Sequence, residues 1–225
     1  MPIKELAGDS KNKLIQNTIA IGAMMSLVGL DFSVLEEALT QLFERKGPLV
    51  VEENVTMARA GYDYSRANFE PFPTPLAEGD KAQAVWSGNE ALAMGGAAAG
   101  VKFYCAYPMS PSTGVLHWMA QNARELGIMV RQVEDEIGVA NMAIGAAHTG
   151  ARAMCATSGG GFALMTEAIG AAAMMEIPVV YINVQRAGPS TGMPTKTEQS
   201  DLYQSVYGRN ADAPLVVLSS RSPSD

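Results

Sequence analysis

The residues best suited to chemistry in this sequence stand in four short segments beside apolar runs. The first is the turn Tyr107-Pro-Met-Ser-Pro-Ser-Thr113, which follows the apolar run 102–106. Ligands of parallel α/β sheets bind beyond the carboxyl ends of strands, and a hydroxyl such as Ser110 together with free helix amides suits an anionic group. A plain strand–turn–helix connection with Ser112 as N-cap is the alternative, and spacing alone favours it.

The second segment, Glu134-Asp-Glu136, opens an expected helix whose other residues are mostly apolar or small. The helix dipole favours acidic residues in a first turn, which accounts for Glu134 and Asp135. Glu136 differs because apolar residues surround it, Ile137 among them. A carboxyl removed from water there would suit proton exchange, while the dipole alternative stays open on spacing alone.

The third segment is the glycine-rich turn Thr157-Ser-Gly-Gly-Gly161 between a strand and a helix. Glycines let a ligand approach backbone amides. The segment is neither a GxGxxG dinucleotide fingerprint nor a P-loop, however. A tight turn without a ligand is therefore the simpler interpretation.

The fourth segment is a long loop, Gln185 to Gln199, that leaves the end of another apolar run. A loop of this length inside a compact domain is usually functional or disordered. Arg186 offers a two-pronged donor for a carboxylate, Lys196 offers a second cation, and Thr195 is one of several hydroxyl donors. The loop therefore predicts a site for an acidic substrate, with a solvated surface loop as the alternative.

The elements that must position these segments alternate between short apolar strands and helices rich in glycine and alanine. Strands are expected at 102–106, 129–132, 151–156, 179–184 and 215–218, and helices at 90–100, 112–126, 134–149 and 162–175. This alternation predicts an α/β fold with a doubly wound, mostly parallel sheet whose two faces are both covered.

Residues 1–69 have a different pattern of apolar residues and are expected to form a small helical segment. Helices are predicted over 14–30, 35–45 and 51–67. Ser33 and Glu36 have the spacing of a capping box for the second of these. Three closely spaced prolines then mark 70–84 as an extended linker, which leaves 85–225 as the second domain. Both ends of the chain are interpreted as cut.

The composition disfavours several classes of function. The chain has 225 residues, a net charge of −7 and no run rich in Lys or Arg, which argues against binding to nucleic acid or to a membrane surface. Cys105 and Cys155 are far apart in the sequence, and with two histidines they cannot supply a metal site or a cluster. No signal peptide is recognised, and 14–30 is too polar and short to span a bilayer, so a cytoplasmic location is expected.

The four segments resemble the α subunit of 2-oxoacid:ferredoxin oxidoreductases, most closely the 2-oxoglutarate type. The most specific stretch is Gln185-Arg-Ala-Gly-Pro-Ser-Thr-Gly-Met-Pro-Thr-Lys-Thr-Glu-Gln-Ser-Asp-Leu202. The resemblance implies a thiamine-diphosphate pyrimidine-binding domain over 85–225, incomplete at its C-terminus. Residues 1–69, with Asn17-Thr-Ile-Ala-Ile-Gly22 and Ala60-Gly-Tyr-Asp-Tyr64, resemble the end of a γ domain that some members fuse ahead of α.

The resemblance also implies a role for individual residues. Glu136 would be catalytic, because its carboxyl would bind N1′ of the aminopyrimidine and favour the tautomer whose nitrogen takes the thiazolium C2 proton; the 2-oxoacid then loses CO₂. The other cofactor-binding residues would be Tyr107, Pro108, Ser158 and Gly159, and the substrate-binding residues Ser110, Arg186 and Thr195.

Much of the enzyme would lie on other chains. The resemblance places Mg²⁺, the diphosphate-binding half and the iron–sulfur cluster on a β subunit, with coenzyme A taking the acyl group and ferredoxin the electrons, so this chain alone should be inactive. The family usually has Tyr-Pro-Ile-Thr-Pro where this chain has Tyr107-Pro-Met-Ser-Pro111. Ser110 keeps the hydroxyl but loses the methyl that restricts its rotamer. Pyruvate, branched-chain and aryl 2-oxoacids therefore stay open as substrates, as does a non-catalytic assembly module.

Overall fold

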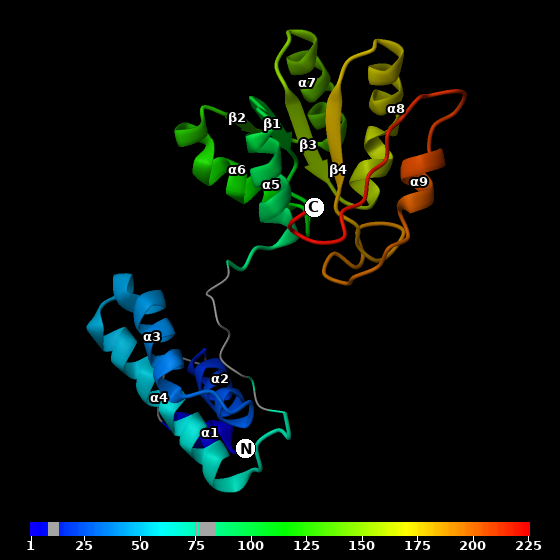
Figure 1. Ribbon diagram of the computed structural model, residues 1–225. Coiled ribbons are helices and arrows are strands. Elements are labelled where there is room, and N and C mark those ends of the chain that lie inside the picture. The colour runs from blue at the N-terminus through cyan, green and yellow to red at the C-terminus, as the bar shows by residue number, and fades with distance from the viewer. Residues whose placement is uncertain (9–13, 75, 77–83) are drawn as a thin grey trace. The chain divides into compact units, whose positions relative to one another are not determined.

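The computed structural model describes residues 1–8, 14–74, 76 and 84–225, which divide into two compact units, Met1–Gln83 and Ala84–Asp225 (Figure 1). Each unit is considered by itself. The part of the expected 70–84 linker at residues 75 and 77–83 lies outside the described residues. Within the described ranges, no helix combines the length and apolar character that crossing a bilayer requires.

The first unit consists of helices, as expected. They are α1 Ile3–Ala7, α2 Ile15–Leu27, α3 Phe32–Phe43, the 3₁₀ helix η1 Glu44–Lys46 and α4 Pro48–Asn68. The predicted capping box is wrong: α3 begins at Phe32, and the carboxylate of its N-cap Asp31 accepts the Ser33 amide at 2.8 Å. Because the helix begins at Phe32, Ser33 lies inside the first turn, and its Oγ donates to Asp31 Oδ1.

Helices α2 and α4 approach so closely that glycine is required at their crossing. A Cβ on Gly22 would overlap the carbonyl oxygen of Ala58, and a Cβ on Gly61 would overlap that of Ile19. Backbone atoms cannot move aside as a flexible side chain can. The two glycines therefore set the distance between the helices.

Gly22→Ala is expected to destabilise the first unit by about 2 kcal/mol, because the added methyl must push α4 away from α2. Urea unfolding followed by circular dichroism measures the loss. Gly145→Ala, in a helix of the second unit, is the control for adding a methyl group to a helical glycine, since a Cβ there meets no atom within 4 Å. Equal stability of the Gly22 variant and the wild type would contradict the close crossing.

The second unit is an α/β sheet domain. Its elements are α5 Gly88–Ala98, β1 Phe103–Ala106, α6 Thr113–Leu126, β2 Met129–Gln132, α7 Glu136–His148, β3 Ala153–Thr157, α8 Gly160–Met174, β4 Val179–Asn183 and α9 Leu202–Tyr207. The strands form one sheet in the order β2-β1-β3-β4, and every neighbouring pair is parallel. The predicted α/β fold with a parallel sheet is confirmed.

The fifth expected strand, 215–218, is wrong. These residues have no strand pairing, and the side chains of Val216 and Leu218 are 87% and 88% exposed. An apolar run becomes a strand only where it finds a hydrogen-bonding partner and a face to bury. The short helices α1 and α9 were not expected from the sequence.

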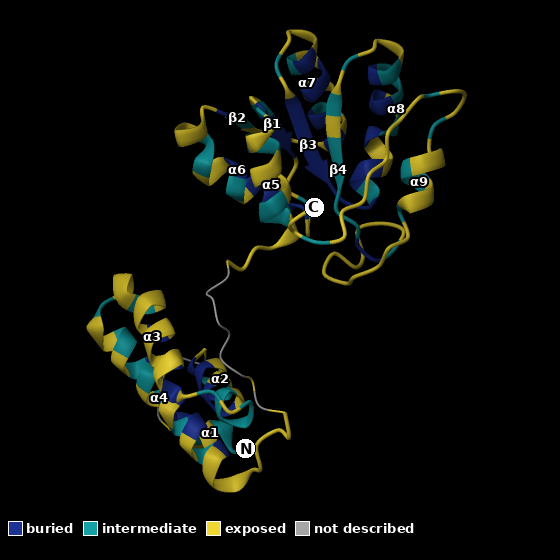
Figure 2. Ribbon diagram, viewed as in Figure 1, coloured by how far each residue is buried: buried dark blue, intermediate teal, exposed yellow. Residues whose placement is uncertain are grey.

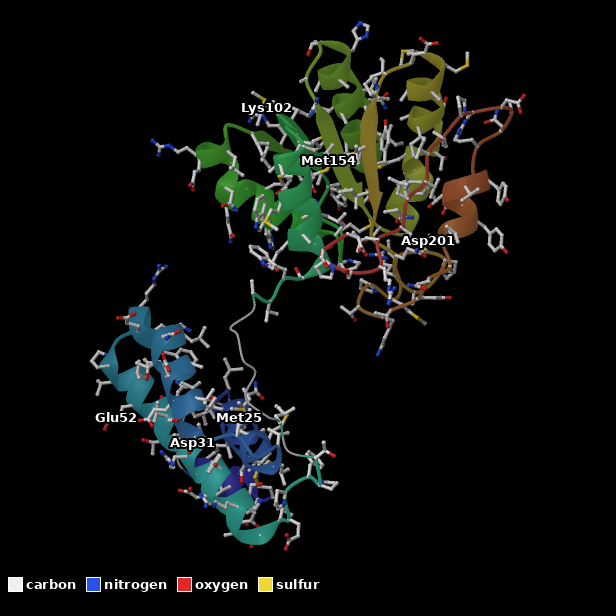
Figure 3. All side chains as sticks on the ribbon, viewed as in Figure 1. Met25, Asp31, Glu52, Lys102, Met154 and Asp201 are labelled. Carbon is white, nitrogen blue, oxygen red and sulfur yellow. The ribbon has the colours of Figure 1, made fainter. Side chains whose placement is uncertain are left out.

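Helices cover both faces of the sheet. α7 and α8 bury one face around Cys105, Val139 and Met165, whereas α5 and α6 bury the other around Tyr104, Met119 and Met154. The strand β3 is buried along its whole length (Figure 2). Met154, labelled in Figure 3, lies against Gly96 of α5, where a Cβ would come within 2.7 Å of its methyl carbon.

The order of the strands places a topological switch point between β1 and β3. From β1 the chain passes through α6 to β2 on one side, and it then crosses through α7 to β3 on the other side of β1. Crevices in such sheets open beyond the carboxyl ends of the two strands at this point. The turns after Ala106 and Thr157 therefore flank the expected ligand site.

The two cysteines, far apart in the sequence, are neighbours in the fold. Cys105 of β1 pairs in register with Cys155 of β3, and both thiols are free and buried. Burial raises the pKa of Cys105 to about 12 and raises that of Cys155 well above its ordinary value. Neither thiol is therefore ionised at neutral pH, and both serve as core side chains.

We expect the native chain to show no reaction with a thiol reagent such as 5,5′-dithiobis(2-nitrobenzoate) at pH 8, because only the thiolate reacts and both sulfurs are shielded. In guanidinium chloride both thiols should react. The absorbance of the released thiolate measures the reaction. Rapid labelling of the native chain would contradict the buried arrangement.

Candidate functional site

The acidic segment after β2 contains one residue that caps a helix and one that is buried. Asp135 is the N-cap of α7, and its carboxylate accepts the Gly138 amide at 2.7 Å. Glu134 is exposed. Glu136, the first residue of the helix, is only 4% exposed. Because Asp135 already caps the helix, the Glu136 side chain is free to turn into the protein.

The buried carboxyl of Glu136 lies against the glycine-rich turn after β3. A Cβ placed on Gly161 would come within 2.7 Å of Glu136 Oε1 and would overlap Thr157 Oγ1. Within the described part of the chain, Glu136 Oε1 has no hydrogen-bond partner. Buried polar atoms are nearly always paired, so an acceptor left free here points to a ligand from outside the described residues.

Arg186 contacts two of the other three segments, the turn after β1 and the glycine-rich turn after β3. Arg186 is 3% exposed, and its Nη1 donates to the carbonyl oxygen of Ser110 at 2.9 Å. It also lies against Gly159, whose φ is +47° and where a Cβ would stand 3.2 Å from Arg186 Nε. The Nε and Nη2 atoms of Arg186 are buried without a partner among the described residues. The guanidinium therefore keeps donors available for an anion.

The remaining predicted residues differ in how close they lie to this cluster. Ser158 is fully buried and its Oγ has no partner in the described structure. Tyr107 and Pro108 are exposed at the end of β1, and Ser110 contributes its backbone carbonyl to Arg186 while its side chain is exposed. Ser112 is the N-cap of α6, in agreement with the interpretation of this turn as a plain strand–turn–helix connection. Its hydroxyl does not cap the helix amides and instead donates to the Met109 carbonyl at 2.7 Å.

The loop after β4 is folded back on itself. The Ala187 amide donates to the Lys196 carbonyl at 2.8 Å, and the Asp201 amide donates to Gln185 Oε1 at 3.1 Å. Thr195, next to Lys196, is exposed, and no described hydrogen bond joins its side chain to Arg186 or Glu136. The structure thus brings Arg186 into the cluster and leaves the Thr195 side chain at the surface.

The sequence reasoning did not single out two residues of the cluster, Asn183 and Gly161. Asn183 ends β4 in register with Thr157, and both polar atoms of its amide are buried without a described partner. The signal available in the sequence was an amide closing the otherwise apolar run Val179–Ile182. The signal for Gly161 was its place in a run of three glycines, which does not reveal what each glycine faces.

The donors and acceptors of this cluster fit an organic ligand with a basic or amino group and an anion. Glu136 Oε1 can accept, Arg186 can donate, and Ser158 Oγ and the Asn183 amide can do both. Among the described residues, no group of three or more His, Cys, Asp and Glu side chains is placed to hold a metal ion. This set of donors and acceptors is compatible with the aminopyrimidine ligand that the sequence resemblance implies.

Comparison with known proteins identifies the family. Residues 94–225, more than half of the chain, match the family model described as pyruvate flavodoxin/ferredoxin oxidoreductase, thiamine diphosphate-binding. The chain belongs to this family. Residues 1–64 match a second model, pyruvate ferredoxin/flavodoxin oxidoreductase. The oxidoreductase family predicted from the four segments is confirmed.

Relatives with curated names are similar over much of the chain. The 2-oxoglutarate oxidoreductase subunit KorA of Mycobacterium tuberculosis is 39% identical over 98% of this chain and 35% of that protein. The 2-oxoglutarate synthase subunit KorA of Archaeoglobus fulgidus is 49% identical over 61% of this chain and 40% of that protein. This chain thus spans between a third and two fifths of these oxidoreductase subunits.

A solved structure supports the same assignment. The 2-oxoglutarate:ferredoxin oxidoreductase from Magnetococcus marinus, determined with 2-oxoglutarate, coenzyme A and succinyl-CoA bound, superimposes with a TM-score of 0.83 at 36% identity. The match covers 95% of this chain and 38% of that one. The fold of this chain is therefore that of the corresponding part of the M. marinus oxidoreductase chain.

Proposed function

We propose that this chain is part of the α subunit of a 2-oxoacid:ferredoxin oxidoreductase and binds the aminopyrimidine side of thiamine diphosphate. The assembled enzyme would oxidatively decarboxylate 2-oxoglutarate to its acyl-CoA. The observation that carries the proposal is the buried Oε1 of Glu136, which has no partner among the described residues and lies beside the switch point of the sheet. The names of the relatives from M. tuberculosis and A. fulgidus and the ligands of the M. marinus structure favour 2-oxoglutarate as the substrate.

Glu136 is the proposed catalytic residue. Thiamine diphosphate, when bound, supplies the electron sink that decarboxylation of a 2-oxoacid needs. The Glu136 carboxyl would share a proton with the ring nitrogen N1′, and its burial shields that hydrogen bond from water. Because Asp135 caps the helix, Glu136 is free to do so.

Arg186 is the proposed binding group for the carboxylate of the oxoacid. Two of its guanidinium nitrogens, Nε and Nη2, lack a described partner, and the bond from Nη1 to Ser110 fixes the side chain in place. Two N–H groups on a fixed guanidinium match the two oxygens of a carboxylate. The hydroxyl of Ser110 and that of Thr195 are proposed to bind the substrate as well.

Four further residues are proposed to contact the cofactor. Tyr107 and Pro108 after β1, and Ser158 and Gly159 after β3, would line the cofactor. Their support is their place on the two turns that flank the switch point, together with the Oγ of Ser158, which has no partner in the described part of the chain. Gly159, which has a positive φ, contacts Arg186, so the proposed cofactor-binding turn would lie beside the proposed substrate-binding residue.

The rest of the enzyme is proposed to lie on other parts of the assembly. A β subunit would hold Mg²⁺, the diphosphate and an iron–sulfur cluster, and ferredoxin and coenzyme A would complete the reaction. Residues 1–69 would be the end of a γ-type domain, 70–84 a linker and 85–225 the pyrimidine-binding domain of a cytoplasmic enzyme. The separate family matches at 1–64 and 94–225 support a division into two domains.

A substrate panel on the complex tests the proposal. The full-length α chain is co-expressed with the proposed β subunit, and reduction of ferredoxin is followed with each oxoacid in turn, with coenzyme A present. We expect 2-oxoglutarate to have the highest kcat/KM and activity to require added thiamine diphosphate. A preference for pyruvate or for a branched-chain or aryl oxoacid would replace the proposed substrate. A lack of activity with all of them would favour an assembly module.

A further inference from the structure

Three consecutive glycines after Thr157 face three different surroundings. Gly159 has a positive φ and contacts Arg186, and a Cβ on Gly160 would meet no atom within 4 Å. Gly161 faces the acidic residue of the site. A Cβ there would lie 2.7 Å from Glu136 Oε1 and 2.9 Å from Glu136 Cγ, and it would overlap Thr157 Oγ1. Of the three, Gly161 alone faces the carboxyl.

The backbone does not require a glycine at position 161. Gly161 lies in the first turn of α8, and it is not among the glycines with positive φ. Alanine is the better helix former, so a requirement for glycine cannot come from helix propensity either. What remains is space: the volume that a methyl group would fill is bordered by the Glu136 carboxyl and the Thr157 hydroxyl.

We propose that Gly161 is a positioning residue, whose missing side chain leaves the space in which the Glu136 carboxyl lies. This inference rests on the proposed function of Glu136. A methyl group on residue 161 would meet the side-chain carbon Cγ of Glu136 as well as its terminal oxygen Oε1, so the carboxyl has to turn or withdraw. Displacing a catalytic group by about 1 Å costs on the order of 100-fold in rate.

Gly161→Ala in the full-length complex tests the proposal. We expect kcat to fall about 100-fold while KM for the oxoacid changes little, because the reacting groups and not the substrate contacts are displaced. The melting temperature of the complex should remain near that of the wild type. A structure of the cofactor-free Gly161→Ala complex should show the Glu136 carboxyl moved from its wild-type position, which gives a readout independent of activity.

Gly145→Ala is the matched control. Gly145 is an exposed helical glycine of α7, the helix that Glu136 begins, and a Cβ there meets no atom within 4 Å. It tests the effect of adding a methyl to the same helix about 13 Å along its axis. We expect its kcat to match the wild type.

A second variant covers the case in which the overlap with Thr157 prevents assembly. Thr157→Ala removes the overlapping oxygen, so in the double variant Thr157→Ala/Gly161→Ala the atoms nearest to the new methyl group are those of Glu136. We expect its kcat to lie well below that of Thr157→Ala alone. Equal kcat values for these two variants would overturn the positioning role.

The failure of this inference can be told apart from failure of the proposed function. If Glu136→Gln loses turnover and Gly161→Ala keeps it, Gly161 does not position the carboxyl and the function stands. If Glu136→Gln itself keeps turnover, the proposed function fails first. A Glu136 carboxyl that is unmoved in the Gly161→Ala structure would also overturn the inference.

Discussion

In the complex with its partner subunit, Glu136→Gln is expected to lower kcat by about 1,000-fold. The change keeps the volume of the side chain and leaves the Asp135 cap intact, so the fold and the assembly should persist. What is lost is the acid–base function of the carboxyl toward the cofactor, and such functions contribute about 10²- to 10⁴-fold to rates. Ferredoxin reduction at saturating 2-oxoglutarate and coenzyme A measures the effect.

Glu134→Gln is the matched control for this prediction. Glu134 belongs to the same acidic segment and the substitution is the same, but its side chain is exposed. We expect its kcat to stay within about twofold of the wild type, as surface substitutions usually have small effects. A Glu136→Gln enzyme that works as well as the Glu134→Gln enzyme would exclude Glu136 as the catalytic residue.

Arg186→Ala is expected to lower kcat/KM by about 1,000-fold, mainly through a higher KM for the oxoacid. The substitution removes a buried cation from a carboxylate and also leaves the carbonyl oxygen of Ser110 unpaired. Truncation of one partner in a buried charged pair costs about 2–5 kcal/mol, which corresponds to this range. Steady-state kinetics with varied 2-oxoglutarate separate KM from kcat.

Two further variants sharpen the Arg186 prediction. Arg186→Lys keeps the charge but loses the paired N–H geometry, so its KM should lie between those of the wild type and Arg186→Ala. Arg124→Ala removes a cation from the exposed end of α6 and should leave KM unchanged. An Arg186→Ala enzyme with wild-type KM would contradict the carboxylate-binding role, whatever its kcat.

The parallel sheet and most of its elements could be predicted because most of the strands are short apolar runs bounded by polar or glycine-rich turns. β2 was predicted with its observed bounds, Met129–Gln132, and β4 to within one residue at its end. Residues 215–218 have the same composition but no partner to pair with, and a single-chain pattern cannot distinguish the two cases. Asp31 takes the place of the expected Ser33 cap because the helix begins at Phe32, so that Ser33 lies inside its first turn.

The residues of the candidate site were harder to predict than the elements that carry them. Glu136 could be chosen as a candidate because mostly apolar residues follow it, and Arg186 because it lies in an unusually long loop. That Arg186 would hold the Ser110 carbonyl, 76 positions away, depends on strand order, which residue patterns do not contain. The same holds for Gly161 and Asn183, whose neighbours come from other segments.

The most direct test of the account is the rate at which the C2 proton of bound thiamine diphosphate exchanges with deuterium in the assembled complex. Quenching in acid followed by proton NMR of the cofactor measures this rate without any oxoacid, coenzyme A or ferredoxin. The account predicts that exchange in the Glu136→Gln complex is slower than in the wild type by about 10²-fold or more. Exchange at the wild-type rate in that complex would contradict it.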